Sequence, residues 1–170
     1  EKTLLVPCHV GYVVNQKAQN HALPHAGLVK GTQTKDYPTA MCIQQTPPGL
    51  IPEGEYQMTI LPYALREQSL EMRKDQRYSK LWEDISQFNK ALGLNSRGHL
   101  EDYLKHFQKQ LDLFVAEFER VPKQVGAIIL INGQVVGIER GPSVQYFADV
   151  WEPLIRECYG SLAIQIVQES

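Results

Sequence analysis

The sequence has no apolar run near the roughly 18 residues that a membrane-spanning helix needs. It also lacks a basic excess, because its net charge is −2, and this argues against nucleic acid as a partner. No secretory signal peptide is visible. The three cysteines lie far apart among apolar neighbours, which favours buried thiols over disulfides: Cys8, Cys42 and Cys158. These absences predict a soluble cytoplasmic domain that binds neither a membrane nor nucleic acid.

Known catalytic motifs are missing as well. The chain has no glycine-rich phosphate loop, no Gly-x-Ser-x-Gly turn of a serine nucleophile and no Cys-x-x-Cys pair of a zinc site. Its polar residues do not group into a convergent constellation along the chain. We therefore predict no catalytic residue, no metal site and no cofactor.

Seven polar residues are candidates for ligand or partner contacts. His21 and His25 have the spacing of two metal ligands on a helix, but Pro24 lies between them, so a surface loop is the better interpretation. Glu53 and Glu55 flank a glycine in a turn, where paired carboxylates can act as acid and base but are more often simply exposed. The other candidates flank the long loop described next: Lys30, Gln44 and Gln45.

The first part of the chain is predicted to form short strands around one irregular segment. The strands are expected at 4–6, 10–14, 40–45 and 56–61. Segment 15–39 shows no sustained period and contains several prolines and glycines, so we expect a long irregular loop or arm there. Loops of this length are uncommon in compact domains and are usually functional or disordered.

Helical spacing of apolar residues dominates the middle of the chain. Helix formers predict a short helix over 63–72. A second helix is expected over 81–92, with Gly93 as the left-handed residue that ends it. An apolar stripe then predicts one helix of five turns over 100–118, which Asn95 or Ser96 caps.

The most specific local signal is a β-hairpin over 125–139. Its two apolar runs are joined by Asn132-Gly133, which suits a type I′ turn because both central residues need positive φ. Ser143 is then expected to cap a helix in which Pro153 produces a kink or a junction of two shorter helices. The periodicity of 162–167 does not distinguish an edge strand from a helix.

This order of elements predicts an α+β fold for a single domain over residues 1–170. We expect a mixed or antiparallel sheet that includes the hairpin, with three or four helices packed mainly on one side. The chain begins with Glu1 and not with methionine, and a strand-like run follows at once, whereas chain starts are usually loose. A trimmed terminus or the C-terminal fragment of a longer protein would explain this start.

Several short motifs, in this order, resemble those of one family. They are Leu4-Leu5-Val6-Pro7, Ala40-Met41-Cys42-Ile43-Gln44-Gln45, Ile60-Leu61-Pro62 with Leu65-Arg66, Leu81-Trp82, Val121-Pro122-Lys123-Gln124-Val125-Gly126, Ile131-Asn132-Gly133, and Val150-Trp151 with Leu154. The family is the ARG-and-rhodanese-phosphatase-superfamily-associated protein domain, which is linked to prokaryotic conflict systems. The resemblance spans most of the chain and implies a shared fold. A polar segment of the family would lie upstream of Glu1, and its Gly-Arg-Trp-like continuation is replaced here by Thr46-Pro47-Pro48-Gly49.

Three functional hypotheses follow. The leading one is a non-catalytic interaction or assembly module that self-associates or docks on a protein partner, since no polar site converges and segment 15–39 is long enough to order on a partner. The second is a hydrolase or a domain that binds a nucleotide derivative such as ADP-ribose, in which His21 or His25 would meet Glu53 or Glu55. The third is a processed phage or virion component, which would place the protein in the virion.

Overall fold

The computed structural model describes residues 2–13, 20–45, 57–74 and 81–169. The strands are β1 (Thr3–Val6), β2 (Val10–Val13), β3 (His21–Ala22), β4 (Gly27–Lys30), β5 (Met41–Cys42), β6 (Gln57–Ile60), β7 (Gly126–Ile131) and β8 (Gln134–Arg140). The helices are α1 (Tyr63–Lys74), α2 (Trp82–Ala91), α3 (Leu100–His106), α4 (Gln108–Ala116), α5 (Val144–Pro153), the π-helix η1 (Leu154–Tyr159) and α6 (Gly160–Glu169). The content of helices and antiparallel strands confirms the α+β prediction.

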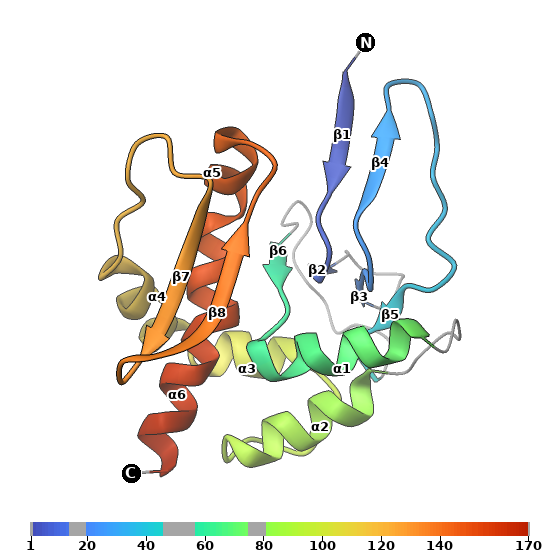
Figure 1. Cartoon of the computed structure of the whole chain (residues 1–170). Helices are drawn as coiled ribbons and strands as arrows, with labels where there is room; N and C mark the ends of the chain where they lie inside the picture. Colours follow the sequence, from blue (N-terminus) through green and yellow to red (C-terminus); the bar gives the residue numbers. More distant parts are fainter. Residues whose placement is uncertain (1, 14–19, 46–56, 75–80, 170) are drawn as a thin grey trace.

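The described strands form three antiparallel sheets. One pairs β1 with β4, the second has the strand order β5-β3-β2-β6, and the third is the β7–β8 hairpin. Figure 1 shows the hairpin lying along the helical run α5–η1–α6, while β1 and β4 form a ribbon on the other side, with α1 and α2 beneath β6 and this ribbon. The start of α1 therefore lies where the central sheet meets the hairpin.

Segment 15–39, expected to be irregular, contains two short strands. β3 pairs with β2, and β4 pairs with β1. The expectation of an irregular loop is therefore wrong for the residues of β3 and β4. Residues 15–19 of this segment lie outside the described residues. Strands of two and four residues are too short to display a period in the sequence, so the prediction missed them.

The helix predicted over 100–118 is two helices that meet at Phe107, whose φ is −97° and ψ 12°. The apolar stripe is continuous, but its two halves pack on different partners: α3 packs on α2, and α4 packs on η1 and α6. The predicted cap at Asn95 or Ser96 is also wrong. The N-cap residue is His99, and the backbone N–H of Leu100 instead donates to the carbonyl of Ile43 at 3.2 Å.

The C-terminal predictions are largely confirmed. The hydroxyl of Ser143 accepts a hydrogen bond from the backbone N–H of Tyr146 at 3.1 Å and so caps α5. Pro153 marks the junction at which α5 passes into the π-helix η1, whose six residues are all buried. The undecided segment 162–167 lies within α6.

Two clusters of buried apolar side chains hold these elements together. The first lies between the central sheet and α1–α4 and includes Met41, Leu65 and Tyr103. The second joins β2 and β6 to α5 and η1 and includes Ile60 and Phe147. Cys42 and Cys158 are buried, Cys8 is half-buried, and no disulfide joins these three cysteines. No helix in the described part of the chain is both long enough and apolar enough to cross a membrane.

Candidate functional site

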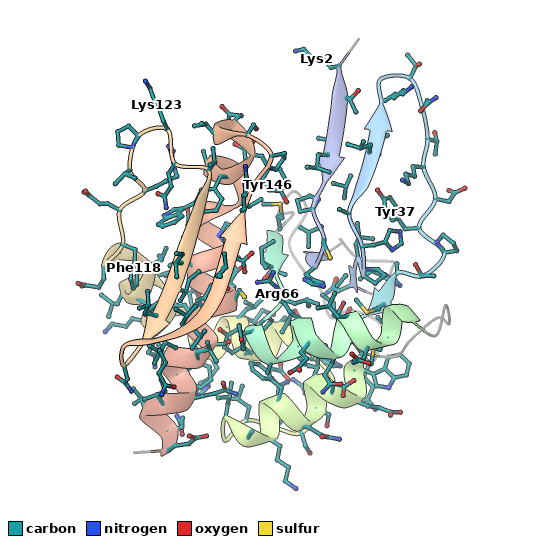
Figure 2. All side chains as sticks on the ribbon, in the orientation of Figure 1. Lys2, Tyr37, Arg66, Phe118, Lys123 and Tyr146 are labelled. Carbon is teal, nitrogen blue, oxygen red and sulfur yellow. The ribbon has the colours of Figure 1, made fainter. Side chains whose placement is uncertain are left out.

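Arg66 on α1 contacts side chains from three other parts of the chain. Its Nε donates to Nδ1 of His9 at 3.2 Å, just before β2. Its two terminal nitrogens donate to the two carboxylate oxygens of Glu139 on β8, and Nη1 also lies 3.5 Å from Sγ of Cys158 on η1. Figure 2 shows Arg66 where α1, β6 and β8 come together. The guanidinium thus joins the central sheet, the hairpin and the C-terminal helices.

Two tyrosines extend this arrangement toward the hairpin. The hydroxyl of Tyr159 donates to Oε1 of Glu139 at 2.6 Å. The hydroxyl of Tyr63 donates to the carbonyl of Val136 on β8 at 2.7 Å, and the two tyrosine rings pack with centroids 5.8 Å apart. We call the set of His9, Arg66, Glu139, Cys158 and Tyr159 the Arg66 cluster.

The protonation states in the Arg66 cluster do not favour nucleophilic chemistry. Burial lowers the pKa of Arg66, but the hydrogen bonds that its guanidinium donates to Glu139 and the neighbouring negative charge outweigh it and raise that pKa above its ordinary value. Burial raises the pKa of Cys158 to about 11, although Arg66 acts in the opposite direction. Burial, followed by Glu139, raises the pKa of Tyr159 as well. At neutral pH the thiol and the phenol both keep their protons.

The Arg66 cluster corrects one expectation from the sequence, namely that no polar groups converge. Arg66 lies 57 residues from His9, 73 from Glu139 and 92 from Cys158 along the chain. Contacts at these separations depend on how the sheets and helices pack. Local sequence motifs therefore cannot reveal these contacts.

Local backbone geometry fixes two positions of this site. His9 has a φ of 61°, which non-glycine residues rarely adopt, and its backbone is hydrogen-bonded on both sides, to Leu23 and to Leu61. A Cβ on Gly137 would lie 2.1 Å from the hydroxyl of Tyr159. Only glycine lets β8 approach Tyr159 closely enough for the contact to Glu139 next to it.

A β-bulge in the hairpin decides which side chains face the cluster. Ile129 pairs with Gly137 and Leu130 pairs with Val135, so Val136 has no partner of its own on β7. If side chains alternated strictly from the solvent-facing Val135 onward, Ile138 would face the helices and Glu139 would face solvent. The extra residue reverses this order, because a bulge shifts the alternation by one.

The result is an aliphatic patch on the hairpin side that faces away from α5, η1 and α6. Ile128 pairs with Ile138, and Leu130 pairs with Val135. Their exposed fractions are 62%, 74%, 55% and 58%, respectively. We call these four residues the outer face. On the inner side, Ala127, Ile129 and Val136 pack against the second core cluster.

The predicted candidates from the first strands lie apart from the Arg66 cluster. Nε2 of His21 on β3 is 3.5 Å from Sγ of Cys42, and the ring of His25 packs against Tyr37 with centroids 5.7 Å apart. Lys30 is exposed at the end of β4. The structure brings neither histidine into a metal site, since no group of three or more potential ligands occurs among the described residues.

The two glutamines join the central sheet to the segment before α3. Oε1 of Gln44 accepts from the backbone N–H of Asn20 at 3.2 Å, and its Nε2 donates to Glu101 at 3.2 Å. Oε1 of Gln45 accepts from the backbone N–H of Gly98, also at 3.2 Å. Both glutamine side chains therefore have a structural role, because they hold neighbouring segments of the chain together. The remaining candidates lie outside the described residues: Glu53 and Glu55.

Two cavities adjoin the Arg66–Glu139 pair. One of about 330 Å³ opens toward α1, and its lining combines polar residues such as His9 and Glu67 with the apolar Leu70 and Ile138. The other, of about 200 Å³, opens toward α5. In both, Arg66 and Glu139 form part of the wall.

Comparison with known proteins identifies one family. The family model of the ARG and Rhodanese-Phosphatase-superfamily-associated Protein domain matches residues 1–170. No curated protein and no solved structure matches the chain.

Proposed function

We propose that this chain, which belongs to the ARG and Rhodanese-Phosphatase-superfamily-associated Protein domain family, is a non-catalytic assembly module whose copies associate through the outer face of the β7–β8 hairpin. The observation that carries the proposal is the exposure of Ile128, Leu130, Val135 and Ile138, each more than half accessible. Contiguous exposed apolar residues on soluble proteins mark interaction sites.

The Arg66 cluster supports this proposal because it fixes the hairpin from behind. Glu139 is hydrogen-bonded to Arg66 and Tyr159, and Tyr63 holds the carbonyl of the bulged residue Val136. An isolated two-stranded hairpin is marginally stable in water. Attached in this way, the hairpin presents the outer face on a rigid support, which lowers the entropy lost on association.

The composition of the outer face favours a second copy of the chain as the partner. None of its four side chains carries charge, and interfaces between identical subunits are more apolar than those of transient heterocomplexes. The Ile–Ile pair and the Leu–Val pair form a surface that can pack on an identical one about a two-fold axis. Two hairpins packed face to face would then resemble a small β-sandwich.

The expected affinity is modest. Full burial of one aliphatic side chain contributes about 1.5–3 kcal/mol, and association costs about 4–15 kcal/mol. Each copy supplies four such side chains, which are already partly covered by their neighbours. We therefore expect a dissociation constant in the micromolar range or weaker, roughly 1 μM to 1 mM.

Sedimentation equilibrium of the purified chain and of Ile138→Lys tests the proposal. The wild-type protein is expected to show a reversible monomer–dimer equilibrium between about 10 μM and 1 mM, and the variant to remain monomeric. Leu28→Lys is the matched control, because Leu28 is a strand residue with a similar exposed fraction of 63% that lies on β4. A wild-type monomer at every concentration, or equal weakening by both variants, contradicts the proposal.

The hydrolase alternative has less support from the site. The thiol of Cys158 and the phenol of Tyr159 are protonated, and the carboxylate of Glu139 is bound to Arg66 and Tyr159. Membership of a prokaryotic or phage conflict system, and a cytoplasmic or virion location, stay predictions from the family resemblance and the composition.

A further inference from the structure

His9 is a titratable residue that lies almost completely inside the molecule. It directly precedes β2, and 4% of its surface is exposed. Its backbone N–H donates to the carbonyl of Leu23 at 2.8 Å, and its carbonyl accepts from the backbone N–H of Leu61 at 3.0 Å. These two bonds hold the backbone of His9, so its ring meets α1 from a fixed position.

The hydrogen bond between His9 and Arg66 requires a neutral imidazole. The Nε–H of Arg66 donates to Nδ1 of His9 at 3.2 Å, so Nδ1 must carry a lone pair. A protonated imidazole has an N–H at both ring nitrogens and accepts no hydrogen bond. Protonation of His9 therefore removes this bond and places a second cation against the guanidinium, an arrangement that like charges disfavour.

The charged groups around His9 do not relieve this conflict. Glu139 on β8 is already bound to Arg66 and to Tyr159. Glu67 on α1 lines the same cavity as His9, but it is exposed to water, which screens its charge. His21 and His25, on either side of Leu23, contact Cys42 and Tyr37 instead. The other titratable neighbours in the described part of the chain are thiols and phenols, which are neutral in mildly acidic solution: Cys8, Tyr63, Cys158 and Tyr159.

Arg66 transmits the protonation state of His9 to the hairpin. The guanidinium that bonds to His9 through Nε also holds both carboxylate oxygens of Glu139 through its terminal nitrogens. A guanidinium is planar and rigid, so these contacts share one orientation. When Nε turns away from a protonated His9, the paired contact to Glu139 is lost with it.

We propose that His9 is an acid-sensitive switch: below about pH 6 its protonation detaches Arg66 from Glu139, releases the hairpin and weakens association through the outer face. The last of these steps rests on the proposed function, whereas the others concern a single molecule. The sign follows from proton binding. The attached hairpin needs a neutral His9, whereas the opened chain binds a proton as the pH falls below the ordinary histidine pKa of about 6.5. Opening is then favoured by up to about tenfold for each further pH unit.

The ¹⁵N NMR signals of the His9 ring test the starting state in the wild-type protein. At about pH 7.5 they are expected to show an unprotonated Nδ1 and a protonated Nε2, as the hydrogen bond from Arg66 requires. A ring that carries its proton on Nδ1, or a charged ring at this pH, contradicts the proposal. This measurement needs no variant.

Amide hydrogen exchange at low protein concentration tests the release of the hairpin. Protection factors of the β7 and β8 amides are expected to fall about tenfold or more between about pH 7.5 and about pH 5, whereas those of α2, in the first core cluster, should change little. His9→Asn should remove this difference, because asparagine tolerates the positive φ and its side-chain oxygen accepts at either pH. His106→Asn is the matched control: His106 is exposed on α3, and this variant should respond like the wild type. Equal protection of the wild-type hairpin at both pH values, or a wild-type response in His9→Asn, would overturn the proposal.

Sedimentation equilibrium at the same two pH values separates this inference from the proposed function. The dissociation constant of the dimer is expected to rise about tenfold or more at about pH 5 in the wild type and to stay unchanged in His9→Asn. A wild-type monomer at about pH 7.5 contradicts the assembly module, and hydrogen exchange still decides whether His9 releases the hairpin. An affinity that is equal at both pH values, although the hairpin opens, contradicts the link from the switch to the outer face.

Discussion

The hydroxyl of Tyr63 donates a hydrogen bond of 2.7 Å to the carbonyl of Val136, the residue that the β-bulge leaves without a partner on β7. A bulge interrupts the ladder and leaves its extra residue unpaired. Tyr63 satisfies this group from α1, which is far from the hairpin in sequence. The same bulge turns Ile138 outward and Glu139 inward, so one hydrogen bond stabilises the geometry on which both the Arg66 cluster and the outer face depend.

Replacement of Tyr63 by phenylalanine is expected to lower the free energy of unfolding by about 1–2 kcal/mol, because the Val136 carbonyl loses its donor. Urea denaturation measures this change. Tyr37→Phe is the matched control, since the buried Tyr37 hydroxyl has no hydrogen-bond partner in the described part of the chain, and its removal should cost little. Equal destabilisation by the two variants would contradict the role assigned to Tyr63.

The Arg66–Glu139 pair is expected to show strong energetic coupling. Arg66→Met and Glu139→Leu should each cost about 3 kcal/mol, because each leaves one largely buried charge unpaired. The double variant should cost less than the sum, with a coupling of about 2 kcal/mol. The exposed pair Arg97–Asp102 provides the comparison, with a coupling below about 1 kcal/mol. Additive effects at Arg66 and Glu139 would show that the pair does not hold the hairpin.

Gly137→Ala is expected to displace β8 from Tyr159. The new methyl group would lie 2.1 Å from the Tyr159 hydroxyl, so strand or ring must move, at a cost of about 1–3 kcal/mol. Gly31→Ala is the control, since its nearest heavy atom would be the Lys2 carbonyl at 3.3 Å. Hydrogen exchange of the hairpin amides should accelerate in Gly137→Ala alone. Unchanged protection there would mean that the close approach is not required.

Titration of Cys158 is expected to make the protein less stable as the pH rises from about 9 to about 11. In this window the unfolded thiol has released its proton while the folded one retains it, because burial raises its pKa from 9.0 to about 11. The folded state then binds more protons, so the free energy of unfolding falls with pH, by at most about 1.4 kcal/mol per pH unit. Urea denaturation at several pH values should give a shallower slope for Cys158→Ala. An identical slope would contradict this assignment.

Local sequence signals correctly predicted the parts of the fold that depend on the backbone conformation or capping ability of a single residue. Asn132 and Gly133 have φ values of 50° and 79°, as a type I′ turn requires. Gly93 has a φ of 73° and ends α2 as expected. The Ser143 cap follows the same logic, because the side chain satisfies a backbone donor three residues ahead.

The break at Phe107 shows where periodicity is insufficient. An apolar stripe specifies which face of a helix is buried but not whether its axis continues straight. Here the residues before Phe107 pack on α2 and those after it pack on η1 and α6. The different packing partners account for the break between the two helices at Phe107. These partners can be identified only when the whole fold is known.

The site was less predictable than the fold because the bulge reverses the pattern of β8. Read with strict alternation, the segment from Val135 to Glu139 suggests an outward carboxylate and an inward isoleucine. The structure has the opposite arrangement. A charged residue on the inner side of a hairpin requires a partner, and this partner, Arg66, is 73 residues away.

Isotope-filtered NOE spectroscopy on an equal mixture of methyl-labelled and unlabelled protein, at about 1 mM, tests the self-association of this domain most directly. We expect intermolecular NOEs from the methyl groups of Ile138 to those of Ile128, Leu130 and Val135 of the second copy, and we expect their loss in the Ile138→Lys variant. Intermolecular NOEs that arise elsewhere on the surface, or none at this concentration, would contradict this expectation.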